Sequence, residues 1–358
     1  MVLKPSELTP LIALELQRLL REAGVPDEVF QVLPGEGATG AALVASDIDK
    51  LVFTGSVATG RRIAQIAAER LLPVVLELGG KDPMLVLDDA DVDVASSGAV
   101  WGAFVNAGQT CLSVERCYVH RSLYPAFVSA CAEKAGKLRV GNGLDAASEM
   151  GPMIHERQVR IVEAHVKDAR ERGARVVAGG ARLRDLGPTF FAPTVLADVN
   201  RDMRVMQEET FGPVLPIAPF EDDAEAVALA NDSEYGLAAS IWTRDRARGE
   251  RLARQVNAGT VMINDVVSCF SISEAPHGGV KASGLGRTHG RWGLEEMVRV
   301  KYVDSDLMPR MKKIWWFGYG REFGAQMEGT LELLFARSWR EKMKAAARSA
   351  GALWRRKL

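Results

Sequence analysis

The chain has 358 residues, of which 47% are hydrophobic and 25% are charged, so it can bury a large core and is predicted to form two domains or one α/β unit with an appendage. Its 45 basic and 46 acidic residues give a net charge of −1, which argues against nucleic acid as a partner because phosphate binding needs a positive excess. The four cysteines are too few for a disulfide framework, and neither they nor the five histidines show metal-ligand spacing. We therefore expect a cytoplasmic protein with no metal site.

The first part of the chain alternates between helical and extended patterns. Apolar residues recur at helical spacing over 7–23, and short apolar runs at 29–33, 51–54 and 74–78 predict strands. A helix is predicted to begin near Val57, directly after the second of these strands. Strands that alternate with helices indicate a parallel sheet covered on both faces.

A second α/β region follows. The patterns predict strands at 84–87, 116–119 and 176–178 and helices at about 91–106, 124–137 and 155–172. The segment 296–303 alternates like a strand that uses both faces.

The composition changes at about Asp306. Residues 306–358 hold 12 basic against 5 acidic residues and four of the seven tryptophans, Trp315, Trp316, Trp339 and Trp354. Apolar residues recur at helical spacing over 327–358, with basic residues between them. We predict a separate, helical tail.

Two residues stand out as candidates for chemistry. Cys111 follows a glycine-interrupted loop after a long predicted helix, where a thiol can act as a nucleophile, although a lone cysteine is more often a small core residue. Cys117, Cys131 and Cys269 lie in regular patterns and are interpreted as core residues. Glu77 lies in an apolar strand just before two glycines, where a carboxylate needs a raised pKa, a catalytic role, or an ion pair such as one with Lys81.

Other polar residues lie where ligands or ordinary turns are equally expected. Gly55 and Ser56 join a strand to a helix N-terminus, which favours a phosphate but also suits a simple N-cap. Lys4 and Glu7 follow a strand end, where open α/β sheets bind ligands and where solvated turns also occur. The Glu208–Pro213 segment pairs two carboxylates with an aromatic residue and a turn.

Seven motifs, taken together and in order, resemble the NAD(P)-dependent aldehyde dehydrogenase superfamily, over residues 3 to about 304. They are Leu3-Lys-Pro-Ser-Glu7, Phe53-Thr-Gly-Ser56, Leu76-Glu-Leu-Gly-Gly-Lys81, Phe104-Val-Asn-Ala-Gly-Gln-Thr-Cys111, Glu208-Glu-Thr-Phe-Gly-Pro-Val214, Asn231-Asp-Ser-Glu-Tyr-Gly-Leu237 and Lys281-Ala-Ser-Gly-Leu-Gly-Arg287. The resemblance implies an α/β fold with a partial Rossmann-like cofactor domain over 1–79 and a catalytic domain over 80–275. It also implies a return segment with a subunit-bridging strand over 276–304, before the tail at 305–358.

The resemblance also implies a reaction, the oxidation of an aldehyde to a carboxylic acid. Cys111 would attack the aldehyde and Glu77 would activate the water that hydrolyses the resulting thioester. The remaining matched residues would hold the cofactor: Lys4, Glu7, Gly55, Ser56, Glu209 and Phe211. A carboxylate at Glu7 would repel a 2′-phosphate, so NAD is expected in preference to NADP.

The chain departs from the family pattern in three places. Relatives carry a long segment before the Lys4 strand, and this segment includes an Asn that donates a hydrogen bond to the oxyanion. We therefore expect this chain to be a fragment of an enzyme, or a non-catalytic or impaired remnant of one. The full-length enzyme is expected to be a homo-oligomer. His277 stands where the family usually has Phe, which makes that wall of the site more polar, although packing as a flat ring is the simpler interpretation. The basic, Trp-rich tail extends past the family end and suits peripheral contact with an anionic membrane, packing on the protein itself, or pairing with another subunit.

Overall fold

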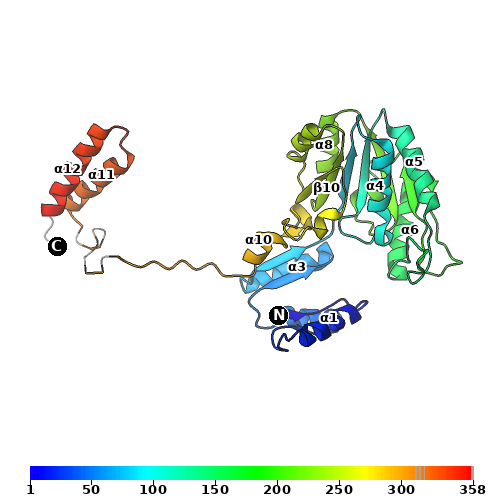
Figure 1. Cartoon of the computed structure of the whole chain (residues 1–358), viewed down its shortest axis with the longest axis horizontal. Coiled ribbons are helices and arrows are strands. Elements are labelled where there is room, and N and C mark those ends of the chain that lie inside the picture. Colours follow the sequence, from blue (N-terminus) through cyan, green and yellow to red (C-terminus); the bar gives the residue numbers. More distant parts are fainter. Residues whose placement is uncertain (308, 311–312, 314–315, 318, 356–358) are drawn as a thin grey trace. The chain divides into compact units, whose positions relative to one another are not determined.

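The computed structural model describes residues 1–307, 309–310, 313, 316–317 and 319–355. The chain divides into two compact units, Met1–Arg299 and Val300–Leu358. Within the first unit, the N-terminal segment (blue) and the large sheet lie at opposite ends, with α3 (Val57–Glu69) between them (Figure 1).

The core of the first unit is a seven-stranded sheet. Its strands follow the order β11-β10-β5-β6-β9-β8-β7 and all pair in parallel except β7 with β8. Their bounds are β5 Asp82–Val86, β6 Val114–His120, β7 Arg175–Ala178, β8 Thr194–Ala197, β9 Val214–Phe220, β10 Ala238–Trp242 and β11 Thr260–Ile263. The α/β fold with a mainly parallel sheet confirms the prediction.

Helices cover both faces of this sheet because successive side chains of each strand point to opposite sides. Met84 and Val86 pack with the apolar side chains of α4 (Val92–Phe104) and α5 (Tyr124–Lys137). Leu85 packs on the other face, where α6 (Glu156–Glu171), α8 (Asp223–Asn231) and α9 (Arg246–Ala253) close the second core. A short helix, α7 (Arg204–Gln207), precedes β9.

The N-terminal part forms two smaller sheets. In one, β1 (Val2–Leu3) pairs in parallel with β2 (Gln31–Val32), beside α1 (Leu11–Glu22) and α2 (Gly37–Ala45). In the other, β4 (Val74–Glu77) lies between β3 (Leu51–Thr54) in parallel and β12 (Gly284–Leu285) in antiparallel orientation. Helix α1 begins later than the predicted residue 7 because Pro10 disfavours a helical conformation at the residue before it.

Residues 296–303, where a subunit-bridging strand is predicted, form no strand in the single chain. Helix α10 (Gly290–Glu295) ends in a turn at Glu296, and residues 299–303 have no regular structure. A strand needs a hydrogen-bonded neighbour, and none of the described strands pairs with this segment. Its predicted bridging to another subunit remains a prediction.

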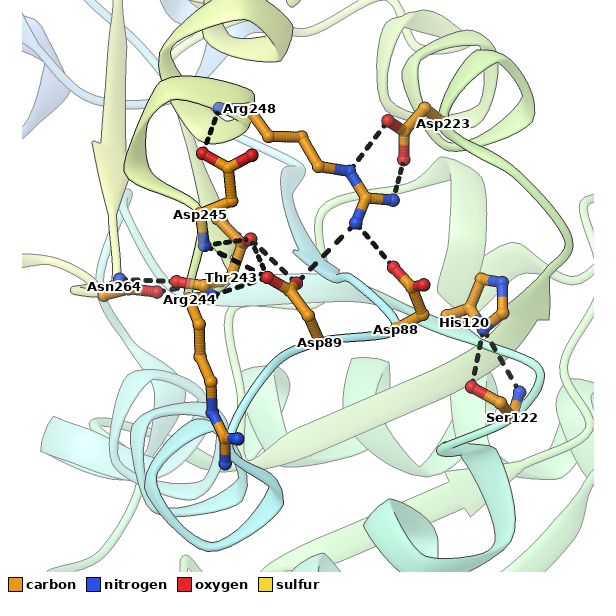
Figure 2. Close-up of polar contacts among 10 residues, drawn as sticks. All are labelled: Asp88, Asp89, His120, Ser122, Asp223, Thr243, Arg244, Asp245, Arg248 and Asn264. Atoms are coloured by element: carbon orange, nitrogen blue, oxygen red, sulfur yellow. Dashed lines mark hydrogen bonds and ion pairs between the residues drawn. The ribbon is translucent and has the colours of Figure 1, made fainter.

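Polar side chains at the carboxyl ends of β5, β10 and β11 are tied to one another (Figure 2). The Asp89 carboxylate accepts hydrogen bonds from the Thr243 hydroxyl and from two backbone N–H groups, and Arg248 donates to both Asp88 and Asp223. The side-chain amide of Asn264, directly after β11, donates to the Thr243 carbonyl at 2.9 Å. Because these groups satisfy each other, this edge of the sheet is explained as a structural network rather than as a ligand site.

The second unit contains two helices, α11 (Arg321–Phe335) and α12 (Trp339–Arg355), packed as a hairpin. The single helical pattern predicted over 327–358 is interrupted because Ser338 starts a new helix: its hydroxyl accepts from the Glu341 N–H, and the Glu341 carboxylate accepts from the Ser338 N–H. Trp315 and residues 356–358 lie outside the described residues. No helix in the described part of the chain is long and apolar enough to cross a membrane.

Candidate active site

Two consecutive glycines bring three candidate side chains together at the end of β4. A Cβ at Gly79 would lie 2.5 Å from the Glu209 carboxylate, and one at Gly80 would lie 2.3 Å from the Cys111 carbonyl oxygen. The Gly80 N–H donates to Glu209 Oε1 at 3.0 Å. The absence of side chains therefore allows the segments that carry Glu209 and Cys111 to approach the turn that follows Glu77.

The backbone before Cys111 is held in a rare conformation. Asn106 and Ala107 have φ values of 53° and 55° within the short 3₁₀ turn Val105–Gly108, a region that costs energy for residues with a Cβ. A Cβ at Gly108 would lie 2.2 Å from the Gly212 carbonyl oxygen, so this loop packs directly against the segment that follows Phe211. The loop and the Glu209–Phe211 segment are thereby fixed relative to one another.

Burial and nearby carboxylates oppose ionisation of the Cys111 thiol. Desolvation, followed by the charges of Asp82, Glu209 and Glu77, raises the pKa of Cys111 to about 12. Cys111 is only partly buried, whereas the other three cysteines are buried as predicted: Cys117, Cys131 and Cys269.

Glu77 is the last residue of β4 and is 7% exposed. Desolvation raises its pKa to about 7, partly offset by the positive charge of Arg287. The predicted alternative of an ion pair with Lys81 is wrong, because Lys81 binds Glu115 instead, with Nζ 2.5 Å from Oε2. A carboxyl group that ionises near neutral pH is suited to proton transfer.

Glu115 on β6 organises the site, although it was not among the residues predicted from the sequence. Besides the contact with Lys81, its carboxylate accepts hydrogen bonds from the backbone N–H groups of Thr210 and Phe211, both at 2.8 Å. Glu115 thus fixes the segment that carries Glu209. A signal was available, because Glu115 and Arg116 interrupt an apolar strand in the same way as Glu77 does.

The two carboxylates of the Glu208-Glu209 pair have different surroundings. Glu208 is exposed and pairs with Arg204 at 2.8 Å. Burial, and then the charge of Glu115, raises the pKa of Glu209 to about 7. Phe211 has a φ of 48°, a strained value for an aromatic residue.

The predicted cofactor residues of the N-terminal part lie in two turns, one after β1 and one between β3 and α3. Lys4 donates from Nζ to the Gly35 carbonyl at 2.8 Å and lies 3.8 Å from Glu7, just after β1. Ser56 is the N-cap of α3, and its hydroxyl accepts from the Thr59 N–H at 3.3 Å, while Gly55 is exposed beside it. The N-cap interpretation of Ser56 is therefore correct, and a phosphate contact at the same helix N-terminus remains a prediction.

His277 lies next to Glu77, with Nε2 3.4 Å from Oε2. The antiparallel pairing of β12 with β4 brings these distant parts of the sequence together. No group of histidine, cysteine or acidic side chains in the described part of the chain could hold a metal ion.

A cavity of about 550 Å³ lies on the other side of β4. Its lining includes Leu76 and Leu78, whose side chains alternate with that of Glu77 along the chain. The cavity is thus separate from the cluster around Glu77 and Cys111.

Residues 1–303 match the profile described as the aldehyde dehydrogenase family. The chain is 44% identical over 337 residues to 4,4′-diapolycopene aldehyde oxidase of Methylomonas sp., covering 93% of this chain and 62% of that protein. It is 45% identical over 305 residues to the Escherichia coli K12 succinate-semialdehyde dehydrogenase (NADP+) GabD, covering 85% of this chain and 63% of that protein.

The fold also matches solved structures. The Mycobacterium tuberculosis aldehyde dehydrogenase in complex with NAD+ has a TM-score of 0.79 and 43% identity, covering 82% of this chain and 61% of that one. The chain thus spans about three fifths of the length of the curated relatives it matches. The matching profile, the identities and the shared fold show that this chain belongs to the aldehyde dehydrogenase family.

Proposed function

We propose that this chain carries the catalytic residues of an NAD-dependent enzyme that oxidises an aldehyde to a carboxylic acid. The observation that carries the proposal is the glycine pair at 79–80, which brings a partly exposed thiol and a buried carboxyl group with a pKa of about 7 to one turn. A nucleophile and a base of these types are what acyl chemistry through a thioester requires.

The chain's own residues account for the bonds that form and break. The Cys111 sulfur bonds to the aldehyde carbon and gives a thiohemiacetal, and loss of hydride from that carbon leaves a thioester. Glu77 takes a proton from water as the water oxygen attacks the thioester carbon. The carbon–sulfur bond then breaks, the sulfur keeps the electron pair, and the carboxylic acid is released. A base at this position favours water over coenzyme A as the acyl acceptor.

The residues fit a nicotinamide cofactor, which accepts the hydride when bound. Ser56 caps the N-terminus of the 13-residue helix α3, and its free backbone N–H groups would receive the pyrophosphate. Lys4 and Glu7 form an ordered pair suited to ribose hydroxyls. Glu209 lies close enough to Cys111 to affect the pKa of its thiol, and Phe211 is held with it by Glu115. These two residues would hold the ribose and ring of the nicotinamide, whose positive charge suits the surrounding carboxylates.

We further propose a preference for NAD over NADP, because the carboxylate of Glu7 would repel a 2′-phosphate. The relatives differ on this point, since the name of the Escherichia coli protein specifies NADP+ and the Mycobacterium tuberculosis structure contains NAD+. The ratio of kcat/KM for the two cofactors tests the preference, and Glu7→Gln should reduce it.

Beyond the enzyme, we propose that the α11–α12 hairpin contacts an anionic membrane surface. Large apolar side chains are exposed around the helix connection, namely Leu331, Leu334, Phe335, Trp339 and Met343. Basic residues flank them, at Arg337, Arg340, Lys342 and Lys344, a combination typical of interfacial helices. The similarity to the Methylomonas protein spans 337 residues, more than the 303 of the family profile.

Sedimentation with vesicles tests this contact. The chain should bind vesicles that contain phosphatidylglycerol and should bind pure phosphatidylcholine weakly, and deletion of 306–358 should abolish binding. Equal binding without the tail would reject the membrane proposal. A second copy of the chain as the occupant of the tail would instead appear as a tail-dependent dimer. We propose separately that the full-length protein is a homo-oligomer.

The enzyme proposal is tested by NADH formation from NAD and a panel of aliphatic and aromatic aldehydes. The purified chain should produce NADH, and Cys111→Ala should produce none. Turnover that survives in the variant would reject Cys111 as the nucleophile. No turnover from a folded wild-type chain would favour the alternative of a non-catalytic or impaired remnant.

A further inference from the structure

Glu77 lies at the buried end of a small cluster of rings. His277 is 4% exposed and places Nε2 3.4 Å from Glu77 Oε2. Its ring packs edge-on against Phe270, with centroids 5.4 Å apart and planes at 88°. The His289 ring follows at 5.7 Å from His277 and is only partly buried. The side chains thus lead from a buried carboxyl group, through a buried imidazole, to a second imidazole that is only partly buried.

Three buried polar atoms in this cluster have no hydrogen-bond partner among the described residues. They are Glu77 Oε1, His277 Nδ1 and His289 Nδ1. An unsatisfied buried polar group costs free energy, so such atoms are rare and each needs an explanation, of which a catalytic role is one. Their concentration beside one candidate base suggests a role in moving protons rather than in stabilising the fold.

The charges around the cluster keep the imidazole of His277 neutral. Desolvation, followed by the neighbouring His289 and Arg287, lowers the pKa of His277 to about 4. The positive charge of Arg287 also lowers the pKa of Glu77, and the charge of Glu77 raises the pKa of the Cys111 thiol. A neutral imidazole can accept a proton at one nitrogen and release one from the other.

We propose that His277 accepts the proton that Glu77 takes from the hydrolytic water and passes a proton on to solvent water. This inference rests on the proposed function, because Glu77 must lose that proton before it can act again. His277 accepts the proton at Nε2 and releases one from Nδ1 to a water molecule, so no reactant other than water is needed. A phenyl ring, usual in the family at this position, could pack against Phe270 in the same way but has no nitrogen to accept a proton.

Kinetics of His277→Phe test the transfer. This variant keeps the flat ring, so the first-turnover burst of NADH should be unchanged, whereas the steady-state rate should fall about tenfold or more. In His277→Ala, added imidazole should restore the steady-state rate in a concentration-dependent way. The matched control is His120→Phe, because His120 packs edge-on against Phe220 at 5.6 Å and 82°, away from Glu77. Equal steady-state rates in wild type and His277→Phe would overturn the proposal.

A second measurement does not depend on turnover. NMR titration of the whole chain follows the ring proton resonances of its five histidines, which His→Asn variants assign. The His277 resonance should show an inflection near pH 7 that reports Glu77, and Glu77→Gln should remove it. A His277 titration that is the same in both proteins would overturn the proposal. If instead Cys111→Ala remains active while this inflection is present, the proposed function fails and the coupling of the two groups stands.

Discussion

Replacing Glu77 with Gln removes a carboxyl group whose ionisation the fold resists. Burial in β4 raises its pKa from 4.5 to about 7, and the side chain is almost fully enclosed. A shift of this size corresponds to about 3 kcal/mol of folding free energy that depends on pH. Gln has nearly the same shape and no charge, so Glu77→Gln removes this cost and little else.

The direction in which stability changes with pH follows from the number of protons bound in the folded and unfolded states. Below pH 4.5 the carboxyl group is protonated in both states and costs nothing. Between pH 4.5 and about 7 the unfolded chain ionises while the folded chain keeps its proton, so wild-type stability falls as pH rises. Above about pH 7 the full cost is present. The variant should therefore gain up to about 3 kcal/mol over wild type between pH 4.5 and pH 8.

Urea unfolding at a series of pH values measures this difference. Glu69→Gln is the control, because Glu69 is exposed at the end of α3 and its loss removes a surface carboxylate. Wild type and Glu77→Gln should diverge as pH rises, whereas Glu69→Gln should follow wild type. If the stability difference between Glu77→Gln and wild type stays constant from pH 4.5 to 8, Glu77 does not ionise with a raised pKa and its assignment as a base loses its physical basis.

Three further changes test how the site is built. Glu115→Gln leaves Lys81 buried without its partner, so urea unfolding should show that the free energy of unfolding falls by about 3–5 kcal/mol. The double variant Glu115→Gln, Lys81→Met should lose less stability than the two single variants together. Additive losses of stability would contradict the pairing of Glu115 with Lys81. Iodoacetamide at pH 7 should alkylate Cys111 at least about tenfold more slowly than it alkylates free cysteine, because the pKa of the thiol is raised. Mass spectrometry of the peptide that contains Cys111 measures this rate, and an equal rate would contradict the burial of the thiol. Gly80→Ala forces a Cβ against the Cys111 backbone. This variant should lower the free energy of unfolding by about 1–3 kcal/mol and should also lower the rate of NADH formation. An unchanged stability and an unchanged rate would show that the turn is loosely packed.

Local patterns in the sequence predicted the regular elements well where periodicity was strong. The limits of α5 and β3 agree with the predicted 124–137 and 51–54. The strand predicted at 296–303 is not formed in the single chain, because alternation describes a surface that could pair, and pairing depends on a neighbour that local sequence does not specify.

The chemistry of the site was predictable only in part. Glu77 was detectable because a carboxylate in an apolar strand requires an explanation, and Cys111 because of the motif that precedes it. The partner of Lys81 was not predictable, since Glu115 lies on another strand and meets it only in the folded sheet. His277 was noticed as a departure from the family, but its contact with Glu77 depends on the pairing of β12 with β4.

Burial has opposite consequences for the two residues proposed to carry the reaction. It brings the pKa of Glu77 close to neutral pH, where a carboxylate is a useful base, and it moves the pKa of the Cys111 thiol to about 12, where a thiolate is scarce. Lys81 cannot correct this imbalance, because Glu115 already neutralises it. A thiol surrounded by carboxylates becomes a nucleophile only when a positive charge enters the site. The proposed function therefore predicts that the oxidised, cationic cofactor binds before the aldehyde and that the thiol is unreactive until then.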